Sequence, residues 1–108
     1  MAACGGGDAG LKEVPEGKLA PESATMKWEQ EFPAGAAPAH VIRRFTSPDA
    51  RASVAGYYNE ALVERGWSAE LSRPDYAEWS HEGMIVSLVF DTPAGGGSEW
   101  SLALFAPE

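Results

Sequence analysis

The segment TSPDARASVAGYYNEALVERGW, residues 46–67, predicts the helix around which the rest of the chain is organised. Ser47 is expected to be the N-cap, and Pro48 suits the first helical position because the amide there has no partner inside the helix. Gly66 is the expected left-handed residue just past the end, and it lets Trp67 fold back onto Leu62. The sequence therefore predicts one helix with a marked start and a marked stop.

The apolar residues of this segment recur at steps of three and four, which gives a single apolar stripe. They are Ala50, Val54, Tyr57, Tyr58, Ala61 and Leu62. We interpret the tyrosine pair as packing and not as a binding site, because Tyr58 lies between Val54 and Leu62 on the stripe. Gly56 costs about 1 kcal/mol relative to alanine inside a helix. We expect it to allow the close approach of another backbone.

Segments on both sides of the helix alternate as β-strands do. Residues 25–32 place Met26, Trp28, Gln30 and Phe32 on one face and predict a half-buried strand. Residues 41–45 predict a second strand, and further strands are expected at 67–71, 76–81, 84–91 and 98–105. Short connections favour an antiparallel meander. The predicted fold is α+β: a single antiparallel sheet of five to six strands, in the order β-β-α-β-β-β-β, with one helix packed on one face.

Residues 84–90 are apolar on both sides, which is typical of a central strand. The second face of this strand could be covered by the N-terminal strand region, by a partner or by a ligand, and cover from the chain itself is the favoured reading. Arg43 and Arg44 lie where they could pair across strands with Glu29 and Glu31. Such pairs would form a solvated face.

Length and charge limit the possible functions. The 108 residues suffice for one domain. Eight basic against sixteen acidic residues give a net charge of -8, which disfavours nucleic acid and docking on anionic lipid. A single cysteine excludes an internal disulfide, and no apolar run approaches the length of a membrane span. Residues 1–21 lack aromatic side chains and are expected to be a flexible tether, with residues 22–108 as the domain.

The start of the chain, Ala2-Ala3-Cys4-Gly5, resembles the processing site of bacterial lipoproteins. In that family a signal peptidase cuts before the cysteine, which then carries acyl chains; here Met1 stands where the usual motif has leucine. The resemblance implies lipid attachment at Cys4 and anchoring to an extracytoplasmic membrane surface, in the periplasm or on the cell surface. An incidental free thiol is the alternative.

The helix ending Leu62, Gly66, Trp67 is also similar to small domains of bacterial lipoproteins and other envelope proteins. This second resemblance is structural and implies no activity.

Catalytic and metal-binding patterns are weak. The two histidines, His40 and His81, have no spacing typical of zinc ligands, and the glycine runs do not form phosphate loops. Glu78 and His81 could act as an acid–base pair, but in a strand they point to opposite faces. We therefore expect neither a metal nor a cofactor.

The sequence favours two functional hypotheses over the others. The first is a non-enzymatic cell-envelope lipoprotein domain, expected to be a monomer, that acts as an interaction or accessory module for an envelope protein. The second is a carrier of a small apolar ligand held between the sheet and its cover. The candidate lining residues are Trp28, Trp79, Trp100, Ile85 and Val89. An enzyme is third.

Overall fold

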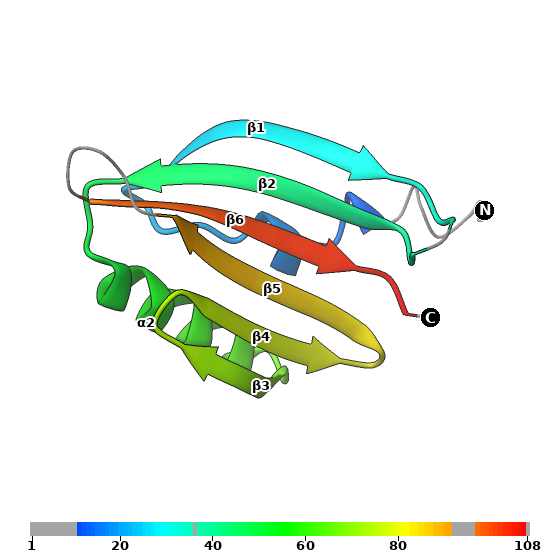
Figure 1. Ribbon diagram of the computed structural model, residues 1–108. Coiled ribbons are helices and arrows are strands. Elements are labelled where there is room, and N and C mark those ends of the chain that lie inside the picture. The colour runs from blue at the N-terminus through cyan, green and yellow to red at the C-terminus, as the bar shows by residue number, and fades with distance from the viewer. Residues whose placement is uncertain (1–10, 36, 92–96, 108) are drawn as a thin grey trace.

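A computed structural model describes residues 11–35, 37–91 and 97–107 (Figure 1). Its elements are η1 (Pro15–Lys18), β1 (Thr25–Phe32), β2 (His40–Ser47), α2 (Arg51–Glu64), β3 (Ser68–Arg73), β4 (Tyr76–His81), β5 (Met84–Asp91) and β6 (Ser98–Phe105). In this described part, the strands form one antiparallel sheet in the order β1-β2-β6-β5-β4-β3. The predicted α+β class and the predicted order of elements are confirmed.

The connection through α2 determines the topology. Strand β2 pairs with β6, so α2 carries the chain from the interior of the sheet to its far edge at β3. From there β3 to β6 return as a meander of neighbouring strands. Strand β5 therefore lies between two neighbours, as expected for the run that is apolar on both sides.

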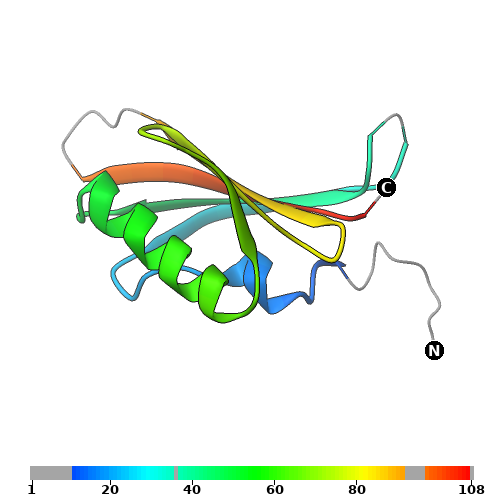
Figure 2. The ribbon, with the colours of Figure 1, turned by 90° about the horizontal axis from the view of Figure 1, so that it is seen from below.

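The core lies on the side of the sheet that faces α2, which we call the helix side (Figure 2). Val54, Tyr58 and Leu62 are the buried residues of the helix. The sheet side chains in the same buried cluster are Val41, Phe45, Ala77, Trp79, Val86, Leu88, Phe90, Trp100, Leu102 and Leu104. Alternation along each strand places them on one face.

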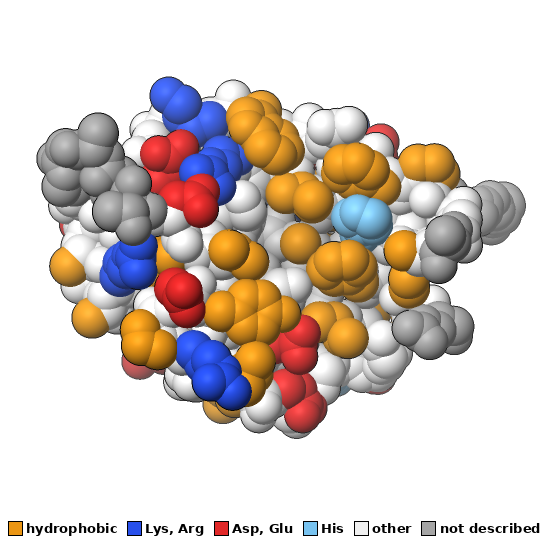
Figure 3. Space-filling model, in the orientation of Figure 1, with side chains coloured by type: hydrophobic (Ala, Val, Ile, Leu, Met, Phe, Trp, Pro, Cys, Tyr) orange, Lys and Arg blue, Asp and Glu red, His pale blue; other side chains and the backbone are white. Residues whose placement is uncertain are grey.

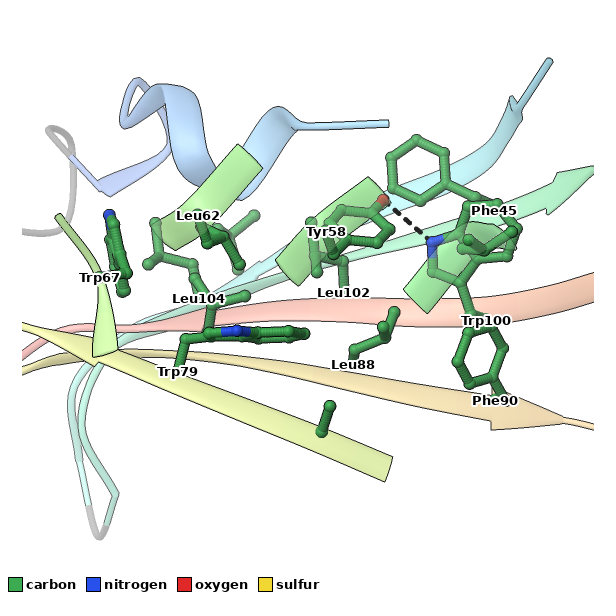
Figure 4. Close-up of a cluster of buried hydrophobic side chains, with 14 of the residues drawn as sticks. Phe45, Tyr58, Leu62, Trp67, Trp79, Leu88, Phe90, Trp100, Leu102 and Leu104 are labelled. Atoms are coloured by element: carbon green, nitrogen blue, oxygen red, sulfur yellow. Dashed lines mark hydrogen bonds between the residues drawn. The ribbon is translucent and has the colours of Figure 1, made fainter. Parts of the chain in front are cut away.

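Tyr58 joins the helix to the sheet and to the N-terminal segment (Figure 4). Its hydroxyl accepts from Trp100 Nε1 at 3.1 Å and donates to the carbonyl of Leu19 at 2.6 Å. Burial raises the pKa of Tyr58 well above its usual value, so the hydroxyl keeps its proton. Trp79 Nε1, from β4, donates to Asn59 Oδ1 of α2 at 3.1 Å. The polar groups of these large side chains are thus satisfied inside the core.

The helix begins later than expected. Ala50 is its N-cap, and no side chain caps it. Ser47 instead ends β2, where it pairs with Ser98, and its hydroxyl accepts from the amide of Asp49 at 3.0 Å. Pairing of β2 with β6 continues through Ser47, so the serine supports the turn before the helix and not the helix itself.

The helix ends as predicted. Gly66 has φ of +93°. The amide of Gly66 donates to the carbonyl of Val63, and the amide of Trp67 donates to the carbonyl of Leu62, both at 3.0 Å. These two bonds define the Schellman motif. The expectation for Gly56 is wrong: it is exposed, and a Cβ there would meet nothing within 4 Å.

Strand β1 has the predicted bounds, but it is not half-buried. It is an edge strand, and Met26 and Trp28 are 50% and 47% exposed. A bulge between these two residues pairs Met26 with Phe45 and Trp28 with Arg44. Because the bulge adds a residue, Met26 and Trp28 face opposite sides of the sheet and not the same side, as the alternation predicted.

The N-terminal segment differs from the expected tether over residues 11–21. Leu11 and Gly17 are buried, and η1 lies on the same side of the sheet as α2 (Figure 2). Arg43 anchors this segment: it is 2% exposed and donates to the carbonyls of Gly17 at 2.5 Å and Lys12 at 3.1 Å. Residues 1–10 lie outside the described part of the chain.

The two adjacent arginines have separate roles. Arg43 Nε pairs with Glu29 at 2.6 Å, as expected, but this occurs on the helix side and not on a solvated face. Arg44 lies on the opposite side and pairs with Asp91 and Glu99 instead of Glu29 or Glu31. Neighbours on a strand point to opposite faces, so the RR pair is divided between core and surface.

Candidate functional site on the open face of the sheet

The sheet has a second face, which we call the open face. Of the described segments, α2 and η1 both lie on the helix side (Figure 2). The pairing register places these side chains on the open face: Trp28, Gln30, Phe32, His40, Ile42, Arg44, Tyr76, Glu78, Ile85, Ser87, Val89, Ser101, Ala103 and Phe105. Figure 3 shows this face with a broad group of apolar side chains.

Aromatic rings from three strands stack at one end of the open face. His40 lies between Phe32 and Phe105, with ring centroids 4.6 and 4.8 Å apart. Charged side chains gather toward the other end, where Arg44 pairs with Asp91 and Glu99 (Figure 3). The open face is therefore apolar at the end where β6 finishes and ionic at the end where it starts.

A groove of about 510 Å³ crosses the apolar end of this face. Its lining residues are Pro38, Tyr76, Glu78, Gly83, Ile85, Ser87, Phe105 and Ala106. Ser87 pairs with Glu78 on one side and Ala103 on the other, while Ile85 pairs with Phe105 one step along the face. Small side chains at 87 and 103 leave a hollow beside the larger ones. Its size falls within the range of small-molecule sites.

The polar groups of the groove come from β4. The Tyr76 hydroxyl donates to Glu78 Oε2 at 2.8 Å. Burial, followed by the hydrogen bond to the Glu78 carboxylate, raises the pKa of Tyr76 above its usual value. Among the described residues, no Lys, Arg or His nitrogen lies within 4.0 Å of the Glu78 carboxylate. The groove therefore combines apolar walls with a carboxylate that has a neutral partner only.

The proposed ligand-lining residues are divided between the two faces. Ile85 lines the groove, and Val89 and Trp28 lie on the open face, 40% and 47% exposed. Trp79 and Trp100 lie on the helix side, 3% and 0% exposed, where they fill the space between the sheet and α2 (Figure 4). The structure thus does not bring these five residues into one lining.

Sequence reasoning missed Tyr76, Glu78 and Phe105 as lining residues. Tyr76 and Glu78 alternate with Ala77 and Trp79, so their shared face could have been recognised in the sequence. Their position beside Phe105 could not, because it follows from the pairing of β4, β5 and β6. Cys4 lies outside the described residues.

Potential catalytic groups are separated. His81 packs against Trp67 on the helix side, with ring centroids 5.4 Å apart, whereas Glu78 is on the open face. In the described residues, no group of three or more His, Cys, Asp or Glu side chains could hold a metal ion. The acid–base pair considered from the sequence is thus not assembled here.

No described helix has both the length and the apolar character needed to cross a bilayer. Comparisons with protein-family models, curated proteins and solved structures find no match to this chain.

Proposed function

We propose that this chain is a non-enzymatic binding module of the bacterial cell envelope, held at a membrane through acyl chains on Cys4. Its open face is the proposed surface for a protein partner with a complementary apolar surface. The observation that supports the binding role is the open face itself, which exposes Trp28 and Val89 and holds the groove. Sheets normally bury an apolar face against a second layer, so an apolar face that no described helix covers is the surface we propose for interaction.

The membrane anchor is proposed from the resemblance of Ala2-Ala3-Cys4-Gly5 to lipoprotein processing sites. Leu11 is already buried against the folded domain, so six residues, 5–10, separate Cys4 from it. Six extended residues span at most about 20 Å. An acylated Cys4 would therefore hold the folded domain close to the membrane surface.

Fractionation of cells that express the full-length precursor tests the anchor. Wild-type protein is expected in the membrane fraction, with an intact mass raised by acyl chains on an N-terminal Cys4. The Cys4→Ala variant should move to the soluble fraction. Wild-type protein without added mass, or a variant that stays with the membrane, would contradict the anchor.

Site-specific photo-crosslinking tests the binding surface. The crosslinker p-benzoylphenylalanine replaces Val89 or Trp28 on the open face, or Val63 as a matched control. Val63 is an apolar residue of α2 and is 50% exposed. The same envelope protein should be captured from both open-face positions and not from position 63. Equal capture from all three positions would contradict the assignment of the surface.

A second candidate function is the carriage of a small apolar ligand. The groove favours it, although on the open face and not between the sheet and its cover. Ser87→Leu would place a larger side chain on the floor of the groove. If the protein carries such a ligand, purified wild-type protein should release a bound molecule on solvent extraction, and the Ser87→Leu variant should release much less. An equal yield from both proteins would remove this candidate.

A further inference from the structure

We propose that the groove on the open face binds an organic cation: a small molecule with a flat apolar body and an amine or quaternary ammonium group. This inference goes beyond the proposed protein-binding role: it concerns the groove alone and names the class of small ligand that the groove would take.

The charge of the ligand follows from Glu78. This half-buried carboxylate lies in a groove whose other lining residues are uncharged, and Tyr76 donates one hydrogen bond to its Oε2 atom. Elsewhere in the described chain, Glu29, whose side chain is 26% exposed, has Arg43 as a cationic partner. A carboxylate that is partly desolvated without a counter-charge gains most from a cationic ligand. The net charge of -8 further attracts a cation to the surface.

The apolar body follows from the opposite wall of the groove. Ile85 and Phe105 pair across β5 and β6, and Phe105 stacks on His40. A flat ring can lie against this wall, over the hollow at Ser87. Glu78 and Phe105 come from strands two spacings apart, about 10 Å. A ligand with one ring and an adjacent ammonium group can therefore reach both walls.

The same lining disfavours an anionic ligand such as a fatty acid. The groove contains a carboxylate and no Lys or Arg, so a ligand carboxylate would meet a like charge. The aromatic rings of Tyr76 and Phe105 line the groove, and an ammonium group placed over a free ring face would gain further attraction from the π-electrons. The groove thus distinguishes ligands by the sign of their charge.

Titration of ¹⁵N-labelled full-length protein with benzyltrimethylammonium tests the inference, with benzenesulfonate as the anionic counterpart. The cation should shift the amide signals of Ile85, Ser87 and Phe105, and the anion should not. Glu78→Gln should weaken binding of the cation about fivefold, since one partly solvated ion pair is lost. Glu60→Gln removes the same charge from an exposed site on α2, and its affinity should stay within about twofold of wild type, because a distant charge is screened by salt.

Three results would overturn the inference: equal weakening by Glu60→Gln and Glu78→Gln, signal shifts outside the groove, or benzenesulfonate binding as tightly as the cation. Ser87→Leu should abolish binding. If the Ser87→Leu variant does not fold, the affinity of the Glu78→Gln variant for the cation still tests the inference, because glutamate and glutamine side chains are of equal size.

The outcome is separable from that of the proposed function. If the cation does not bind while Val89 and Trp28 still capture a common protein, the ligand class is wrong and the protein-binding role stands. If the cation binds in the groove while no protein is captured, the protein-binding role is wrong and the ligand class stands.

Discussion

The guanidinium group of Arg43 donates from Nη1 to the main-chain carbonyl of Gly17 at 2.5 Å, which joins the second strand of the sheet to the N-terminal segment. A second bond runs to the carbonyl of Lys12 and an ion pair to Glu29. One buried cation thus satisfies three acceptors, two in the N-terminal segment and one in β1, and its own charge is compensated by a carboxylate.

Replacing this cation should loosen the N-terminal segment. Arg43→Met keeps much of the apolar volume but removes the donor to both carbonyls, and it leaves Glu29 with only the longer ion pair to Lys12 Nζ at 3.7 Å. We expect a loss of about 2–3 kcal/mol in the free energy of unfolding, measured in urea at pH 7. Trypsin should also cut faster after Lys12 and Lys18. The control Arg65→Met removes an exposed pair with Glu16 and should cost less than about 0.5 kcal/mol; equal losses from the two variants would contradict the anchoring role.

The pH dependence of stability should identify the Glu29 contribution. The hydrogen bond from Arg43 lowers the pKa of Glu29 below its usual value of 4.5, against an opposing effect of desolvation. A carboxyl group whose pKa is lower in the folded state stabilises the fold above its unfolded pKa, and this contribution is lost as the pH falls through the folded value.

The stability difference between wild type and Glu29→Gln should therefore be largest near neutral pH and should shrink below about pH 5. Unfolding in urea at a series of pH values measures it. Glu31→Gln serves as the control, since the Glu31 side chain is 47% exposed and its ion pair within the described residues is a long one, with Lys12 at 4.0 Å. A difference for Glu29→Gln that does not change with pH would contradict the coupling to Arg43.

Two glycines of the helix region should respond to alanine in opposite directions. Gly56 is exposed inside α2, and nothing lies within 4 Å of an added Cβ, so Gly56→Ala should stabilise by about 0.5–1 kcal/mol. Gly66 has φ of +93°, and Gly66→Ala should destabilise by about 1 kcal/mol. Thermal unfolding of both variants measures these shifts, and changes of the same sign would contradict the position of the helix end.

The elements whose signals are local could be predicted from the sequence. The bounds of β1, the positive φ of Gly66 and the interior position of β5 follow from alternation, turn chemistry and apolar content within a few residues. The start of α2 could not be predicted, because Ser47 is held by pairing with Ser98, which is 51 positions away. The folding of residues 11–21 could not be predicted either, because their main-chain carbonyls bind Arg43 and Tyr58, and every residue has such a carbonyl.

The candidate site was predictable only in part for the same reason. Alternation separates Ile85 and Val89 from Val86 and Leu88, but it does not say which set faces the helix. That choice depends on the register of the whole sheet and on the side that α2 takes. Trp79 and Trp100 were grouped with Ile85 because all three are large and apolar. The pairing of the strands puts the two tryptophans on the helix side and Ile85 on the open face.

Trp28 provides a direct optical test of which tryptophan lies on the open face. It is 47% exposed, while Trp67, Trp79 and Trp100 are 3%, 3% and 0% exposed. Acrylamide should therefore quench one component of the native fluorescence efficiently and the remainder poorly, because quenching requires collision with the indole. Trp28→Phe should remove the quenchable component with little change in stability, since β1 is an exposed edge strand. If the quenchable component persists in Trp28→Phe, a second indole is accessible and the assignment of the buried core on the helix side is wrong.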